Sequence, residues 1–261
     1  MRDRRRLGGL VLHQLRYENK AFWRNPPSVF FTFAFPLIFL ALFNAFFGNQ
    51  VINYFGHRTR TSTLFIPTIA AFSIINATFT NLAISLTFAR ERGLLKRTRG
   101  TPLPTWIYLS VRILHAGAVG VALVVIVAVA GALAYDVDLP RHTLPALVLT
   151  LAVGGLTFAS LGIATTAVVS NADASPAVVN GIILPLLFIS GIFFRVDQAP
   201  QWLGRVADLF PVRHLAQAMQ HAFNPFETGS GLRGGDLRVM ALWGLAGVVV
   251  AVRFFSWEPR R

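Results

Sequence analysis

The stretch WIYLSVRILHAGAVGVALVVIVAVAGAL, residues 106–133, is almost free of charged side chains and long enough to cross a lipid bilayer. A spanning helix needs about 20 mainly apolar residues, because the hydrocarbon layer is roughly 30 Å thick and a helix rises about 1.5 Å per residue. Its only charged side chain is Arg112, close to its start. The stretch therefore predicts a transmembrane helix.

Further apolar blocks of similar length occur on both sides of this one. They are residues 28–47, 64–89, 144–169, 178–194 and 239–255. Hydrophobic residues make up 54% of the chain and charged residues only 13%, a composition that is typical of bilayer proteins. We therefore expect an all-α polytopic membrane protein with six transmembrane helices.

The segment before the first block predicts a helix that lies along the membrane surface. Its apolar residues recur at roughly helical spacing among arginines and lysines, which is the pattern of an interfacial amphipathic helix. It should end near Pro26 and Pro27, because consecutive prolines break a helix. We expect a cytoplasmic interfacial helix over residues 1–27 and a six-helix transmembrane domain over residues 28–261.

The longest polar stretch, residues 195–238, contains two short apolar segments, 202–209 and 214–223. Both are too short to span a bilayer, so they should lie in the interface or re-enter the membrane from the outer side. Backbone at membrane depth must be covered by protein or face water. We therefore expect re-entrant helices before the last span.

The formal net charge is +13, but the basic residues cluster at the chain start and between apolar blocks. This distribution sets membrane orientation and argues against nucleic acid as a partner. With both termini cytoplasmic, twice as many Lys and Arg residues fall inside as outside, which favours that orientation. We expect a multi-pass protein of the cell (inner) membrane with both termini in the cytoplasm.

The loop RERGLLKRTRGTPLP, residues 90–104, is the densest charge cluster after the N-terminus. By charge alone it is better explained as a solvated loop that only fixes topology. Glu91 favours a second interpretation, docking to a partner, because an acidic residue adds nothing to the orientation rule. The candidate contact residues are Arg90, Glu91, Arg92, Gly93, Lys96, Arg97 and Arg99.

The second span is unusually polar, and at about 100° per residue its polar side chains fall into two stripes. Two polar faces suggest two neighbours, one of which would line a translocation path or a seam between two copies. Ordinary hydrogen bonding between helices, worth on the order of 0.6 kcal/mol per contact, is an equally good explanation. The candidate residues are Ser73, Asn76, Thr80, Asn81 and Ser85.

One segment carries a family resemblance. The sequence LPLLFISGIFFRVDQAPQWLGRVADLFPVRHLAQAM, residues 184–219, closely resembles the C-terminal signature of type-2 ABC exporter permeases, the branch with daunorubicin-resistance-type and nodulation-type subunits. Its Pro–Leu–Leu–Phe, Ser–Gly–Ile–Phe–Phe, Pro–Gln–Trp–Leu and Phe–Pro–Val–Arg–His elements stand in the family's order. The family usually has proline where Arg195 stands. The arginine would alter locally the segment that closes the external end in this family.

The resemblance implies that two permease copies or homologues pair, and that each binds a cytoplasmic ABC ATPase subunit. It further implies that residues 90–99 form a coupling helix and that the segments after Gly191 close the external end. The implied gate residues are Pro185, Gly191, Phe193, Phe194, Arg195, Trp202 and Pro211. The small, aromatic-rich chain has no added sugar-binding domain, which favours a hydrophobic small molecule or a lipid as the cargo, with membrane lipid around the protein.

The chain itself lacks the motif that would power transport. A phosphate-binding loop needs Gly–Lys–Ser/Thr, and neither lysine of this chain follows a glycine. Cysteine is absent, which excludes disulfides and thiolate chemistry. We therefore expect no enzyme activity and no cofactor on this chain, with ATP and Mg²⁺ bound by a separate subunit.

Three other functions stay open from the sequence. Export of a glycan or lipid-linked polymer would use the same architecture. A multi-pass membrane enzyme would need polar residues converging at one depth, for which Asp173, His115 and Ser175 are examples. An ion channel or passive scaffold would act without an ATPase partner. Our principal interpretation is an ATP-driven efflux permease that moves a drug or lipid out of the cytoplasm or the inner leaflet.

Overall fold

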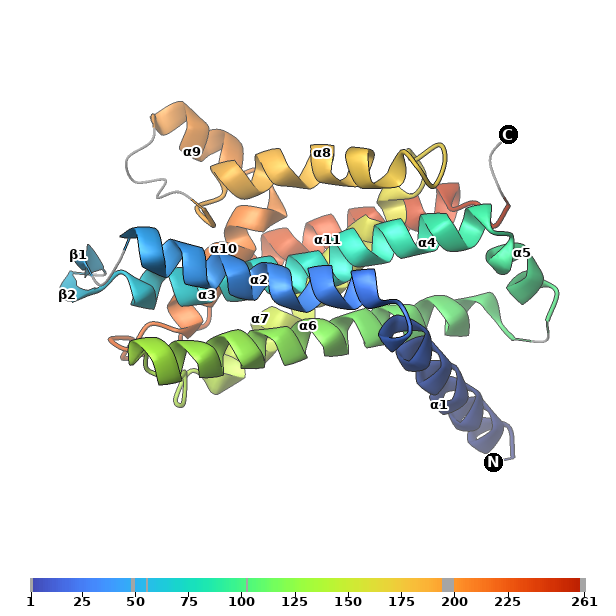
Figure 1. The fold of residues 1–261 in the computed structure, drawn as a ribbon, viewed down its shortest axis with the longest axis horizontal. Coiled ribbons are helices and arrows are strands. Elements are labelled where there is room, and N and C mark those ends of the chain that lie inside the picture. Colours follow the sequence, from blue (N-terminus) through green and yellow to red (C-terminus); the bar gives the residue numbers. More distant parts are fainter. Residues whose placement is uncertain (1, 48–49, 55, 102, 194–199, 259–261) are drawn as a thin grey trace.

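The protein is a bundle of helices that lie along one long axis (Figure 1). The computed structural model describes residues 2–47, 50–54, 56–101, 103–193 and 200–258. One end of the bundle, here called the terminal end, carries both chain termini and the short helix α5 (Leu94–Arg99). The opposite end, here called the hairpin end, carries a pair of short strands and helix α9 (Gln201–Ala207).

Five helices of the described chain are long and apolar enough to cross a membrane. They are α2 (Pro26–Phe47), the continuous unit α3–η1–α4 (Ser62–Glu91), α6 (Thr105–Tyr135), α7 (Leu144–Thr165) and α11 (Gly234–Phe254). The predicted helical, polytopic membrane class is thereby confirmed.

The fifth predicted span, residues 178–194, corresponds to a shorter helix, α8 (Ser175–Ile189). Its 15 residues rise about 22 Å, which is less than the roughly 30 Å of the hydrocarbon layer. Gly191 follows with a φ of 89°, a left-handed conformation that suits glycine and turns the chain. The sixth crossing therefore stays a prediction.

A β-hairpin corrects the all-α expectation. Strand β1 (Val51–Tyr54) pairs antiparallel with β2 (His57–Arg60), so that Val51 lies opposite Arg60. Gly56 has a φ of 79°, which is the conformation that tight hairpin turns require. The strands have four residues each, too short for an alternating pattern to stand out in the sequence.

Helix α1 (Arg2–Trp23) projects away from the bundle at the terminal end (Figure 1). The less exposed face of its described side chains includes Val11, Leu15, Glu18 and Phe22, and α1 packs against α6. Pro26 begins the next helix, because the first helical turn tolerates a residue without an N–H. The predicted break before the first span is therefore present.

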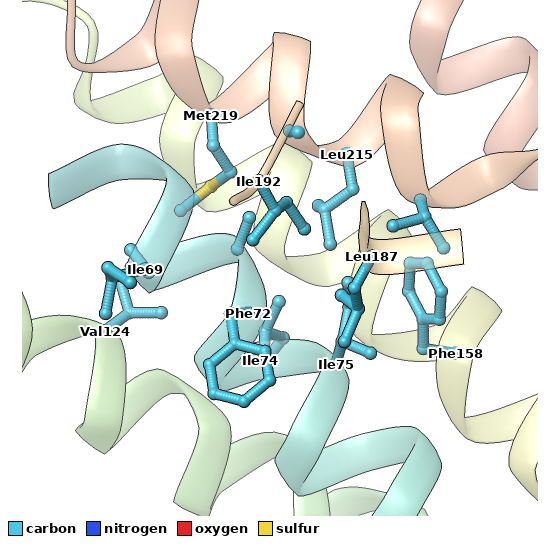
Figure 2. Packing of buried hydrophobic residues seen from close by; sticks show 14 of the residues in the cluster. Ile69, Phe72, Ile74, Ile75, Val124, Phe158, Leu187, Ile192, Leu215 and Met219 are labelled. Atoms are coloured by element: carbon cyan, nitrogen blue, oxygen red, sulfur yellow. The ribbon is translucent and has the colours of Figure 1, made fainter. Parts of the chain in front are cut away.

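The apolar core lies where α3 (Ser62–Ile75) meets α6, α7, α8 and α10 (Pro211–Ala222) (Figure 2). Every residue of α3 is buried. Helix α10 has 12 residues, too few to span, yet most of its side chains are buried against α3, α7 and α11. The re-entry of α10 into the membrane stays a prediction.

Small residues let α7 approach its neighbours closely. Thr157 and Ser160 donate hydrogen bonds of 2.9 and 3.0 Å to the carbonyls of Met240 and Gly244 on α11. On another side, a Cβ at Gly162 would lie 2.8 Å from the carbonyl oxygen of Phe79. The glycine at 162 therefore lets α7 pack directly against the backbone of the second span at Phe79.

Candidate functional site

The second span contains a π-helical turn, η1 (Asn76–Thr80), between α3 and α4 (Asn81–Glu91). A π turn holds more residues than an α turn, so side chains beyond it are rotated relative to those before it. The two stripes drawn at 100° per residue are therefore wrong across this turn. Ser73 and Thr78 are fully buried and donate to carbonyls of their own helix, at 2.7 and 2.6 Å.

Asn81 and Ser85, which lie beyond the turn, face a cavity of about 500 Å³. The cavity lies between the last part of α1, the start of α2, α4 and α6. Asn81 also donates a 3.2 Å hydrogen bond to Thr32 of α2. Asn76 and Thr80 do not line the cavity, so the structure brings together two of the five path candidates.

Arg112 joins three helices beside this cavity, through an ion pair and a hydrogen bond. The Nε of Arg112 on α6 lies 3.3 Å from Oε1 of Glu18 on α1, and both side chains are largely buried, at 14% and 13% exposure. Arg112 Nη1 donates to Ser85 of α4 at 3.3 Å, and its guanidinium lies 5.1 Å above the ring of Tyr108. Breaking such a pair leaves a poorly compensated charge.

Sequence reasoning did not connect these two charges. Glu18 was an acidic residue in a basic amphipathic segment, and Arg112 was a lone charge in an apolar block. Each is a signal of a buried partner, because a charge at membrane depth is costly. Only the packing of α1 on α6 shows that they partner each other.

The charged loop forms an elbow at the terminal end. Gly93 adopts a φ of 68° between α4 and α5, which lets the chain turn sharply. Leu95 is fully buried and anchors α5 in the bundle. The basic residues around it are exposed, and these are Arg92, Lys96, Arg97 and Arg99.

Arg90 differs from the other residues of this cluster because its side chain lies inside the protein, 2% exposed. Its guanidinium donates to the carbonyl oxygens of Thr166, Val169 and Ser170 at 3.0, 2.8 and 3.3 Å. Its Nε lies 3.2 Å from the carboxylate of Glu91. These carbonyls follow the C-terminus of α7, where the helix dipole favours a cation. Arg90 thus ties α4 to α7.

The gate candidates are spread over the hairpin end. Pro185 lies inside α8, Pro211 begins α10, and Trp202 is exposed on α9. Phe193 is buried, with its ring 5.2 Å from Phe39 and 5.6 Å from Phe72. Its ring also contacts Phe43 and Phe188. Phe194 and Arg195 lie outside the described residues.

A buried polar network at the hairpin end was missed from the sequence. His214 Nδ1 lies 2.7 Å from the carboxylate of Asp236, and its Nε2 lies 2.8 Å from the carbonyl of Asp208. Arg233 Nε donates to the other oxygen of Asp236 at 2.8 Å. This network explains why α11 begins at Gly234, five residues before the predicted span, since the polar first turn is paired internally.

The carboxylate of Glu227, in the loop between α10 and α11, should make stability depend on pH. His221 and the backbone N–H of Gly229 both hydrogen-bond the carboxylate of Glu227, and these bonds, the His221 bond most, hold its pKa below the ordinary value of 4.5. A lowered pKa stabilises the fold fully above about pH 4.5, and this contribution is lost as pH falls through the folded pKa. As the pH falls from about 5 to about 3, the thermal stability of the wild type should therefore fall more than that of Glu227→Gln. Parallel pH profiles would contradict this prediction.

The residues suggested for an enzyme do not converge. His115 lines the cavity, Asp173 is exposed on the turn after α7, and Ser175 is buried at the start of α8. Neither Asp173 nor Ser175 lines the cavity that contains His115. Across the described ranges, no three His, Asp or Glu side chains lie close enough to share a metal ion.

Comparison with known proteins places the chain among transport permeases. A family model described as ABC-2 type transporter matches residues 10–224. The inner membrane transport permease YadH of Escherichia coli K12 is 21% identical over 190 residues, which cover 72% of this chain and 73% of YadH. The putative transport permease YvfS of Bacillus subtilis is 22% identical over 76% of this chain and 78% of YvfS. Nodulation protein J of Rhizobium leguminosarum bv. viciae is 39% identical over 64 residues, 24% of this chain and 25% of its own length.

Proposed function

This chain belongs to the ABC-2 type transporter family as a membrane permease subunit, not the ATPase, and from this premise we propose that it exports a hydrophobic or amphipathic molecule. The cargo is a drug or a lipid, taken from the cytoplasm or the inner leaflet. Two copies, or this chain and a homologue, form the path, and two ABC ATPase subunits hydrolyse ATP. Both termini face the cytoplasm, as does the terminal end of the bundle.

The observation that carries this proposal is the elbow between α4 and α5. Helix α5 exposes basic side chains at the terminal end, while Leu95 holds it in the bundle. Arg90, at the end of α4, is bonded to the segment that follows α7. A push on α5 by an ATPase would therefore pass to two long helices at once. Glu91, paired with Arg90, keeps this junction in place.

Removing the exposed charges of α5 should weaken ATPase binding. Arg97→Ala combined with Arg99→Ala removes two exposed cations, and at up to about 1 kcal/mol each we expect roughly tenfold weaker association. The measurement is recovery of the cognate ABC ATPase with the tagged, purified permease at a series of salt concentrations. Arg238→Ala, an exposed arginine of α11 at the hairpin end, is the matched control. Equal loss in both variants would overturn the docking role of α5.

The cargo class is tested on the reconstituted complex. Vesicles containing permease and ATPase should move a fluorescent aromatic dye or a fluorescent short-chain phospholipid when ATP is added, and should not do so without the ATPase. The dye and the phospholipid separate drug from lipid. Movement of a lipid-linked glycan alone would replace the proposed cargo with a polymer, and ATP-independent flux would replace the exporter with a channel.

A further inference from the structure

We propose that the cavity between α1, α2, α4 and α6 binds the anionic headgroup of an amphiphile, through Arg112 and Arg92, with the apolar part of the ligand against Phe22 and Phe88. A phosphate or a carboxylate would be the bound group. The proposal concerns binding alone and holds whether or not the bound molecule is the cargo.

The first observation is a set of unused hydrogen-bond donors. An arginine carries five N–H donors, and the bonds of Arg112 to Glu18 and Ser85 use its Nε and one donor of Nη1. In the described part of the chain, these two bonds leave the other N–H groups of the Arg112 guanidinium for further acceptors. His115 Nε2 is buried without a partner among those residues and belongs to the same cavity lining. In the tautomer that carries the proton on Nε2, His115 adds a donor to those of Arg112, and donors without acceptors in a partly buried site favour a ligand rich in oxygen.

The second observation is the sign of the charge. Two guanidinium groups, of Arg92 and Arg112, line the cavity, against a single carboxylate, that of Glu18. Arg92 lies 5.6 Å above the ring of Phe88, and no carboxylate pairs with it in the described part of the chain. The guanidinium fork matches phosphate and carboxylate geometry, often with two parallel hydrogen bonds. The cavity is therefore built for an anion.

The third observation is the apolar part of the cavity lining. It includes Phe22, Leu82, Ile84, Phe88 and Val119. The volume of about 500 Å³ lies within the range of small-molecule sites, which combine apolar walls with a few placed polar groups. It holds a headgroup and the first part of an apolar chain. The cavity also adjoins α1, the surface helix, where a lipid headgroup arrives from the membrane interface.

Because of the ion pair, the proposal predicts opposite effects on anion binding for substitutions of its two residues. Glu18 competes with a bound anion for Arg112, since both use the same guanidinium. Arg112→Gln should therefore weaken anion binding, whereas Glu18→Gln should strengthen it. A purely structural pair would lower stability in both variants without changing the preference for anionic ligands.

The test is binding of fluorescent phosphatidylglycerol and phosphatidylcholine to the purified full chain in a neutral detergent. We expect the wild type to bind the anionic lipid more tightly. Arg112→Gln should weaken this binding roughly tenfold and Arg92→Gln severalfold. Glu18→Gln should strengthen it. Arg253→Gln is the control, because Arg253 is an exposed arginine in the last turn of α11 that does not line the cavity. Arg92 is exposed, so its variant tests the site even if Arg112→Gln misfolds.

Two results would overturn the proposal. One is equal affinity of the wild type for both lipids, as expected if only water fills the cavity. The other is an equal loss of binding in Arg253→Gln and Arg92→Gln. A second arm, which rests on the proposed function, identifies the source of the ligand. If the wild type binds the anionic lipid and the ATPase complex moves it between leaflets, the ligand is cargo. If it stays in place, the ligand is a resident lipid of the bilayer.

Discussion

Arg90→Ala should lower the free energy of unfolding by about 3 kcal/mol, because a buried cation that satisfies several acceptors is lost. The guanidinium lies at 2.8–3.3 Å from three carbonyl oxygens after α7 and pairs with Glu91. Alanine leaves those carbonyls without donors at a buried helix end. The measurement is loss of helical signal during unfolding in sodium dodecyl sulfate, followed by circular dichroism.

Two variants show whether the effect belongs to this contact. Arg99→Ala removes an exposed arginine of the same charged segment, nine residues after Arg90, and should change stability by no more than about 0.5 kcal/mol. Arg90→Lys keeps the charge but lacks the planar fork, so it should recover only part of the loss. Equal destabilisation by Arg90→Ala and Arg99→Ala would refute the anchoring role of Arg90.

Gly162→Ala should destabilise the bundle by roughly 2 kcal/mol, a typical cost of overpacking. The new Cβ would lie 2.8 Å from the carbonyl oxygen and 3.1 Å from the Cα of Phe79, and 3.2 Å from the carbonyl oxygen of Thr78. All three atoms belong to the backbone of the π turn, which moves only if the helix shifts. Helix propensity alone would predict the opposite effect on stability, because alanine stabilises an ordinary helix by about 1 kcal/mol relative to glycine. The same detergent unfolding assay measures it.

Gly181→Ala is the matched control for this substitution. Gly181 lies inside α8, and nothing within 4 Å would contact an added Cβ. Alanine there should be neutral or stabilise by up to about 1 kcal/mol. If both glycine variants stabilise the protein, the close approach of α7 to η1 is not a constraint on the fold.

The membrane class and most helices could be predicted from the sequence. Apolar blocks long enough to span a bilayer are a one-dimensional signal, because water is excluded along their whole length. The proline pair at the start of α2 and the order of motifs in residues 184–219 are equally local. Each of these features is therefore readable without knowing which segments are neighbours.

The candidate site depended on contacts between distant segments. The π turn at Asn76–Thr80 rotates the polar residues beyond it and so decides which of them face the cavity. Glu18 and Arg112 form a site only because α1 lies on α6. In the sequence, Arg90 does not differ from the other arginines of the charged loop. Only the structure shows that it contacts the end of α7.

The sequence by itself determined that this chain enters the membrane and where its long helices run, since hydrophobic length acts through each segment alone. Only the tertiary structure decided which charges are buried and paired, because the solvation of a charged side chain depends on neighbours from other helices. The exposed arginines of α5 and the buried Arg90 look alike in sequence. Their environments, and hence their expected roles, differ because of the packing.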